Sequence, residues 1–182
     1  FNREMPVTEI VDMRQELAFG NRSIFSRRLY DEIKYNLERN MQTILFINRR
    51  GYSTFISCRK CGHVMMCKRC NVSYTYHSHD NILRCHYCGQ TASVPEICPE
   101  CGSKYIKYFG TGTQKVEEEV KRFFPSAVVL RMDMDTTSKK NSHRAILSEF
   151  GKGNADILIG TQMIAKGHDF PKVTLVGVIA AD

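Results

Sequence analysis

The chain has 182 residues, of which 42% are hydrophobic and 25% are charged. This mixture excludes a disordered or collagen-like segment, and the length is sufficient to bury a core. No apolar run reaches the roughly 20 residues that a membrane span needs, and the first residues do not resemble a secretory signal. The default expectation is a soluble intracellular protein.

The formal net charge is +7, and most of it lies in one segment. Residues 49–109 contain nine basic and three acidic groups, which favours a polyanionic partner and nucleic acid first. All eight cysteines lie in the same segment. Two zinc ions bound by four thiolates each would reduce its charge to about +2, so charge alone is a weak argument for nucleic acid.

A helix and a buried strand are predicted ahead of the cysteines. Apolar residues recur at four- and five-residue steps within residues 23–40, which indicates an amphipathic helix capped by Asn21 or Ser23. The run TILFINR, residues 43–49, has the continuous apolar character of a strand in a parallel sheet.

The cysteines form four Cys-x-x-Cys pairs, which are Cys58/Cys61, Cys67/Cys70, Cys85/Cys88 and Cys98/Cys101. Inside a cell this pattern indicates metal binding rather than disulfides, and four pairs do not resemble a thioredoxin-like redox site. Glycine or asparagine follows each pair, and both tolerate the left-handed backbone of a metal knuckle. Because four thiolates leave no position for a catalytic water, we predict two structural zinc sites.

Three pairings of the four knuckles are possible. Residues 71–84, between the inner pairs, alternate apolar and polar residues and then turn at residues 79–81, which predicts a hairpin. We therefore favour a nested arrangement, in which the two zinc sites are Cys67, Cys70, Cys85 and Cys88, and Cys58, Cys61, Cys98 and Cys101. Side-by-side pairing would leave short connectors and less hairpin to pack. The nearby histidines are interpreted as surface or packing residues, because eight cysteines satisfy two tetrahedral ions.

Helices and strands alternate again after the cysteines. The expected elements are helices at 111–124 and 138–150, and apolar strands at 127–132, 155–161 and 173–181. With the strand at 43–49 they predict an α/β fold with a parallel sheet covered on both faces. The cysteine-rich insertion, residues 52–108, would interrupt a domain made of 1–51 and 109–182 at the carboxyl edge of the sheet, where such sheets bind ligands.

Aromatic residues crowd the cysteine-rich insertion among basic ones. Such rings suit base stacking on single strands. A small module needs most of them for its own core, however, so we expect at most one or two exposed stacking residues, which the sequence does not identify.

Several stretches together resemble the PriA (primosomal protein N′) family of bacterial replication-restart helicases: TILFINRRGYSTFISCRKCG, the eight-cysteine segment, YFGTGTQKVEEEVKRFFP, RMDMDTT and ADILIGTQMIAKGHDFPKVTLVGVIAAD. The likeness runs from about residue 11 to residue 182. It implies a superfamily 2 helicase whose two RecA-like lobes hydrolyse ATP between them, translocate 3′ to 5′ on single-stranded DNA, and carry a zinc-binding insertion in the second lobe.

The chain lacks parts that the resemblance implies for a whole enzyme. It contains no G-x-x-x-x-G-K-[ST] loop and no acidic Walker B box, and it stops before the final arginine-bearing motif. We therefore expect an incomplete second lobe that is inactive as an ATPase alone. The run GTGTQK, residues 110–115, lacks the ending of a phosphate loop and is interpreted as a glycine turn before a helix whose N-terminus could hold a DNA phosphate.

The stretch GTQMIAKGHDFP resembles the family's motif V and follows a strand, so its polar residues are expected at the carboxyl edge. On that match Gly167 and Asp169 would face the ribose and phosphates of the nucleotide. Thr161, Gln162 and Lys166 would contact the DNA backbone. The alternative is an ordinary strand-to-loop turn with a solvated lysine and aspartate.

Arg49 and Arg50, just after the first strand, look like residues of the family's motif IV. They could contact DNA or the nucleotide, or form a solvated basic pair.

The resemblance also implies cofactors and partners. These are two Zn²⁺ ions, ATP and Mg²⁺ in the whole enzyme, forked and single-stranded DNA, the single-stranded DNA-binding protein and the machinery that loads the replicative helicase during primosome assembly. The expected location is the bacterial cytoplasm beside the nucleoid. Two alternatives remain open: a zinc-ribbon module that mainly binds another protein, and a zinc-stabilised α/β protein with no nucleic-acid role.

Overall fold

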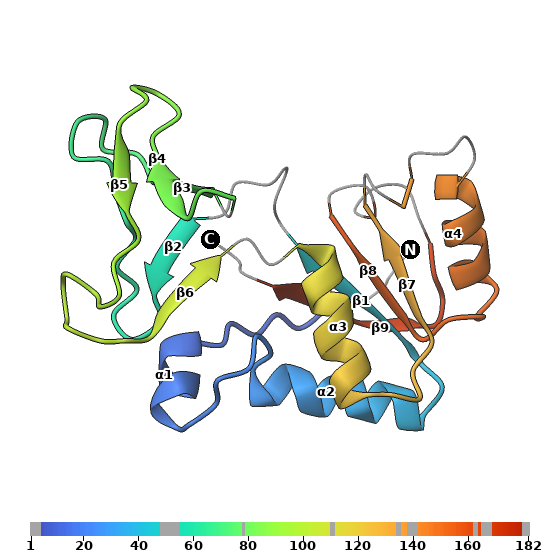
Figure 1. Ribbon diagram of the computed structural model, residues 1–182. Coiled ribbons are helices and arrows are strands. Elements are labelled where there is room, and N and C mark those ends of the chain that lie inside the picture. Colours follow the sequence, from blue (N-terminus) through green and yellow to red (C-terminus); the bar gives the residue numbers. More distant parts are fainter. Residues whose placement is uncertain are drawn as a thin grey trace.

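The computed structural model describes residues 5–47, 55–77, 79–109, 112–133, 136–137, 142–161, 164 and 169–179, with only the backbone at 107–109. A four-stranded parallel sheet with helices and a cysteine-rich segment with two small antiparallel sheets lie side by side (Figure 1). This mixed α/β architecture confirms the predicted fold class.

The elements alternate as predicted outside the cysteine-rich segment. In chain order they are α1 (Met13–Ala18), α2 (Arg27–Glu38), β1 (Gln42–Ile47), β2 (Phe55–Cys58), β3 (Thr75–His77), β4 (Ile82–Arg84), β5 (Thr91–Ser93), β6 (Ile106–Phe109), α3 (Thr113–Phe123), β7 (Val129–Met132), α4 (Ser142–Gly151), β8 (Ile157–Gly160) and β9 (Val173–Ile179). None of the helices in the described ranges is long and apolar enough to cross a membrane.

The parallel sheet has the strand order β7-β8-β1-β9. In its register Gly160, at the end of β8, lies between Phe46 of β1 and Met132 of β7. The carboxyl ends of these strands therefore meet at one edge. All four residues of β8 are buried, which is why this strand has no polar alternation in the sequence.

The two faces of the sheet have separate cores. On one face α2 and α3 pack against β1, β8 and β9 through a buried cluster that includes Ile33, Leu45, Val116 and Ile159. On the other face Phe150 of α4 packs against a second cluster of buried residues. The predicted cover on both faces is therefore present.

The cysteine-rich segment leaves the sheet after β1 and returns to it at α3. Antiparallel pairing of β2 with β6 joins the start and the end of this segment. The hairpin β3–β4, extended by β5, lies farther from the parallel sheet (Figure 1). The apolar core of this part is small and consists of Ile56, Met65, Tyr74 and Leu83 packed among the cysteines.

The start of α2 differs from the prediction. The N-cap is Ser26, whose hydroxyl accepts a hydrogen bond from the N–H of Leu29 at 3.1 Å. Asn21 and Ser23, the predicted caps, accept instead from the N–H groups of Ser23 and Phe25, two residues ahead of each. Both residue types make such local turns as readily as helix caps, so the sequence alone does not choose between them.

Gly160 provides a test of the packing at the sheet edge. A Cβ atom at this position would lie 2.9 Å from the backbone oxygen of Met132 and 3.0 Å from Ile164. We expect Gly160→Ala to lower the free energy of unfolding by about 1–3 kcal/mol in urea titrations, because β7 must move. Gly151→Ala is the control, since its Cβ would meet only Phe170 at an ordinary 3.5 Å. Equal stability of the two variants would contradict this explanation.

Candidate metal centres and sheet edge

All four Cys-x-x-Cys pairs have the same backbone geometry. In each pair the N–H of the residue after the second cysteine donates to the carbonyl of the first, at 2.8–2.9 Å. That residue has a positive φ in every case, at Gly62, Asn71, Gly89 and Gly102. The glycine and asparagine signal in the sequence therefore marks four metal knuckles.

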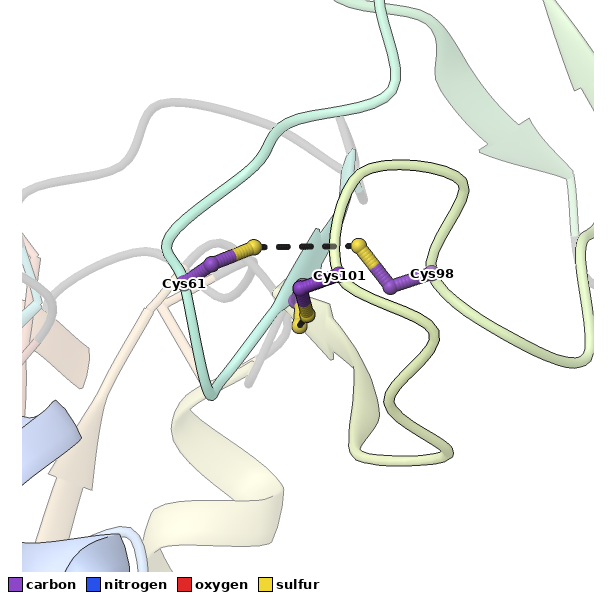
Figure 2. A group of neighbouring side chains, drawn as sticks. Cys61, Cys98 and Cys101 are labelled. Atoms are coloured by element: carbon purple, nitrogen blue, oxygen red, sulfur yellow. Dashed lines mark hydrogen bonds between the residues drawn. The ribbon is translucent and has the colours of Figure 1, made fainter.

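The knuckles combine in the nested arrangement. We call Cys58, Cys61, Cys98 and Cys101 the outer cluster, and Cys67, Cys70, Cys85 and Cys88 the inner cluster. Within each cluster all sulfur atoms lie within 4.8 Å of one another. Figure 2 shows Cys61 and Cys98 of the outer cluster pointing toward each other from two loops, with Cys101 beside them.

The sulfur spacing fits zinc. Four sulfurs in a tetrahedron around Zn²⁺, with Zn–S bonds of about 2.3 Å, lie about 3.8 Å apart. The sulfurs of Cys58 and Cys101 lie 3.6 Å apart, and those of Cys67 and Cys88 lie 3.7 Å apart. These distances are far longer than a disulfide bond, which is about 2.0 Å. The two clusters therefore support two zinc ions, and they would use all eight thiolates.

The electrostatics of the clusters also favour a cation. Burial raises the pKa of Cys67, but N–H groups of Cys70 and Arg69 and neighbouring thiols donate to its sulfur and lower the pKa to about 6. The thiol contacts of Cys70, mainly with Cys88, and burial raise its pKa to about 12. The outer cluster likewise has one thiol with a lowered pKa, Cys58 at about 7, and one with a raised pKa, Cys61 at about 12. Full ionisation of four adjacent thiols therefore requires a metal ion.

Histidines do not join the metal-binding groups found in the described part of the chain, which consist of cysteines only. His77 and His86 stack on each other, with ring centroids 5.4 Å apart. His79 pairs with Asp80 at 2.8 Å in the turn between β3 and β4. These contacts agree with the interpretation of the histidines as surface or packing residues.

The outer cluster is attached to the N-terminal part of the chain. Arg59, which is only 8% exposed, donates to the carbonyl of Arg22 at 2.7 Å and to that of Asn21 at 3.0 Å. The guanidinium of Arg22 in turn contacts the hydroxyl of Tyr105 at 3.2 Å. These bonds join the segment before α2 to the first and last parts of the cysteine-rich segment.

Glu16 of α1 also binds this segment, through hydrogen bonds to Asn21 and Arg27. Burial raises its pKa, but hydrogen bonds from the side chain of Asn21 and from Arg27 lower the pKa to about 2. The Asn21 contact is 2.6 Å long and the contact from the Arg27 N–H is 2.9 Å. The carboxylate is therefore ionised at neutral pH and keeps the backbone of Asn21 in place to accept the bond from Arg59.

The two ends of the GTQMIAKGHDFP stretch lie apart. Thr161 follows β8 at the carboxyl edge of the sheet. Asp169 is exposed and precedes Phe170, whose ring packs against Phe150 near the C-terminal end of α4, at a centroid distance of 5.0 Å. Thr161 therefore lies at the carboxyl edge as expected, and the place of Asp169 at the nucleotide stays a prediction.

Five predicted ligand-binding residues lie outside the described residues. They are Arg49, Arg50, Gln162, Lys166 and Gly167.

A polar network at the carboxyl end of β7 was not predicted from the sequence. The Asp133 carboxylate accepts from the hydroxyl of Thr113, in the first turn of α3, and from the N–H of Thr136. Arg131 lies between two carboxylates, at 2.9 Å from Asp133 and 3.0 Å from Glu117. Burial raises the pKa of Asp133, but these donors and the guanidinium lower it below its usual value. The alternation of acidic residues in RMDMDTT was the available signal.

This network limits which groups at the N-terminus of α3 could bind a phosphate. The helix is capped by Gly112, which offers no side-chain hydrogen bond. The hydroxyl of Thr113 is already used by Asp133. A phosphate at this helix end would therefore have to bind through backbone N–H groups, and this remains a prediction.

Comparison with known proteins gives one family match and several close relatives. The model of the PriA DNA helicase Cys-rich region (CRR) domain matches residues 67–92, which contain the inner cluster, β3, β4 and the first two residues of β5. Replication restart protein PriA of Bacillus subtilis (strain 168) is 56% identical over 181 residues, and that of Synechocystis sp. is 52% identical over 185 residues. Both alignments cover 100% of this chain. The PriA protein of Haemophilus influenzae is 44% identical over 86% of this chain.

The chain spans 22% of the length of each of these three relatives. It is therefore similar to one continuous part of much longer proteins.

The nested arrangement can be tested by counting zinc ions in cysteine pairs. We expect Cys58→Ser with Cys98→Ser to keep one zinc ion per chain, because both substitutions remove ligands of the outer cluster. Cys58→Ser with Cys67→Ser should lose both ions, because each cluster then has only three sulfurs. Metal analysis after gel filtration measures the difference. Side-by-side pairing would give the opposite result for the two double variants.

The contribution of Arg59 to stability can be tested by comparing its substitution with that of Lys60, the neighbouring basic residue. Arg59→Ala should lower the free energy of unfolding by about 2 kcal/mol, because two carbonyls lose a charged donor. Lys60→Ala removes an exposed charge from the same knuckle and should change the free energy of unfolding by less than about 0.5 kcal/mol. Both variants should retain two zinc ions, and urea titrations of the zinc-loaded chain measure the difference. Loss of zinc from the Arg59 variant would show that the residue supports the cluster instead.

Proposed function

Because this chain belongs to the PriA family of replication restart proteins, as a segment spanning 22% of their length, we propose that it is part of an ATP-dependent DNA helicase. The whole protein would move 3′ to 5′ on single-stranded DNA, remodel stalled or forked replication DNA, and help to restart replication through primosome assembly. Its partners would be forked DNA, the single-stranded DNA-binding protein and the proteins that load the replicative helicase.

The observation that carries this proposal is the place of the cysteine-rich segment in the fold. It leaves the parallel sheet at the carboxyl end of β1 and re-enters at α3, beside the edge where open α/β sheets bind their ligands. Two zinc clusters with complete sulfur shells have no position for a reacting water, so they would hold this insertion in place rather than perform chemistry.

We assign the parallel sheet and its helices, residues 1–51 and 109–182, to an incomplete RecA-like second lobe, and residues 52–108 to the zinc-binding insertion. Sheet order and helices on both faces support this division. ATP and Mg²⁺ would bind between this lobe and a first lobe that carries the phosphate loop. The chain alone is then inactive in ATP hydrolysis.

We assign two roles to the stretch from Thr161 to Asp169, as its resemblance to motif V implies. Thr161, with Gln162 and Lys166, would contact the DNA backbone, and Gly167 with Asp169 would face the nucleotide. Arg49 and Arg50 follow β1 in the sequence and would add DNA or nucleotide contacts. A stretch that contacts both ligands can couple ATP binding to movement along DNA.

A second function, as a platform for another protein, has one observation in its favour. Once both zinc ions are bound, residues 49–109 keep a charge of only about +2, which is weak for a general nucleic-acid surface. A partner complex that survives high salt would support this function, whereas DNA binding that weakens with salt supports the helicase role.

The helicase role is tested in the whole protein by Asp169→Ala. We expect DNA-stimulated ATP hydrolysis to fall by at least about tenfold, because the lobe interface loses a group that faces the nucleotide. Zinc content should not change. Asp31→Ala, which removes an exposed carboxylate from α2, is the matched control. Unchanged hydrolysis in the Asp169 variant would remove this residue from the nucleotide site.

A further inference from the structure

The two zinc clusters contain similar basic pairs in different surroundings. Arg59 and Lys60 lie between the first two cysteines of the outer cluster, and Lys68 and Arg69 lie between those of the inner cluster. Arg59 is buried and donates to backbone carbonyls. Lys68 and Arg69 are both exposed, and within the described residues their side chains have no hydrogen bond or ion pair. The basic pair of the inner cluster therefore has no structural task in this fold.

The second knuckles of the two clusters also differ in the charge of their side chains. The outer cluster has Pro99 and Glu100 between its cysteines, and the inner cluster has His86 and Tyr87. The outer cluster thus carries the carboxylate of Glu100, which lies 4.0 Å from the ring nitrogen Nδ1 of His63. The inner knuckles have no acidic residue, and exposed Arg84 precedes Cys85 directly.

Tyr87 is 82% exposed, the highest value among the phenylalanine and tyrosine side chains described. The other well-exposed rings each have an arginine over them, at 5.3 Å for Phe19, 3.7 Å for Tyr35 and 5.5 Å for Tyr105. Within the described chain no cation or second ring covers Tyr87. Its faces are therefore free to stack on another planar group.

The free basic pair and the exposed ring belong to the two knuckles of one cysteine cluster. An open depression of about 560 Å³ is lined by Lys68, Arg69, Cys88, Gly89 and Gln90. Tyr87 immediately precedes Cys88 in the same knuckle. Gly89 has a φ of +73° and nothing within 4 Å of where a Cβ would lie, so the depression stays open above its backbone. We call Lys68, Arg69, Tyr87, Gly89 and Gln90 the inner-cluster face.

We propose that the inner-cluster face binds single-stranded nucleic acid. Lys68 and Arg69 pair with consecutive phosphates, and Tyr87 stacks on an unpaired base. Cations beside a free aromatic ring are the combination that single-strand binding surfaces use, and a duplex does not offer a base face to the ring. The inference rests on the nucleic-acid partner of the proposed function, but not on ATP hydrolysis.

The charge of the zinc centre weakens the long-range attraction between this face and a phosphate backbone. A zinc ion with four thiolates carries −2, which offsets much of the positive charge of Lys68, Arg69 and Arg84. Attraction at long range is therefore weak, and binding depends on direct phosphate contacts and on stacking. An acidic peptide would satisfy the two cations but would leave the ring of Tyr87 unused, so the ring favours nucleic acid over a protein partner.

The test measures binding of a fluorescent oligothymidine to the zinc-loaded chain at several salt concentrations. Lys68→Ala with Arg69→Ala should weaken binding and reduce the slope of log K against log salt by about 1.4, since each phosphate contact on a single strand contributes about 0.7. Tyr87→Ala should weaken binding about tenfold, and Tyr87→Phe, which keeps the ring, by less than about twofold. A blunt duplex should bind more weakly than the oligothymidine and be unaffected by Tyr87→Ala.

The matched control is Lys60→Ala with Lys104→Ala, which removes two exposed lysines from the same cysteine-rich segment. It should leave the affinity and the salt slope of the Tyr87-dependent binding unchanged, and all variants should keep two zinc ions. Three outcomes would each overturn the proposal. The control could weaken binding equally, or the unaltered chain could fail to bind oligothymidine. A polyglutamate peptide could also bind through Lys68 and Arg69 while oligothymidine does not. Unwinding by the whole protein, measured separately, shows whether the proposed function fails as well.

Discussion

Four sulfur atoms within 4.8 Å of one another can all ionise only around a cation, and the cysteine-rich segment contains two such groups. The segment has little else to hold it together. Its strands are three or four residues long, and its apolar core consists of a few side chains packed among the cysteines. A core of this size does not stabilise a fold without additional links, which here would be two zinc ions.

The nested order of the clusters determines how the segment sits on the rest of the chain. The outer cluster joins the first and last knuckles, so β2 and β6 lie next to each other where the segment leaves and re-enters the parallel sheet. Arg59, in the first knuckle, then reaches the carbonyls of Asn21 and Arg22. The inner cluster lies farther along the segment, and its basic pair faces solvent.

The carboxyl edge of the sheet has its own polar network. Asp133, Arg131 and Thr113 connect the end of β7 to the first turn of α3, the helix that begins where the cysteine-rich segment ends. The network therefore links the end of β7 to the helix with which the chain returns to the parallel sheet.

The sequence by itself determined the fold class and the two groups of metal-binding cysteines, because both depend on local patterns. Apolar strands alternate with amphipathic helices, and each Cys-x-x-Cys pair precedes a glycine or asparagine whose backbone forms the knuckle. Only the tertiary structure decided what similar residues do. Arg59 and Lys68 occupy equivalent positions in two knuckles, yet one is buried against a segment 37 residues earlier in the chain and the other is exposed. The start of α2 at Ser26, the Asp133 network and the exposure of Tyr87 were decided in the same way, because burial and hydrogen-bond partners come from residues that are distant in sequence.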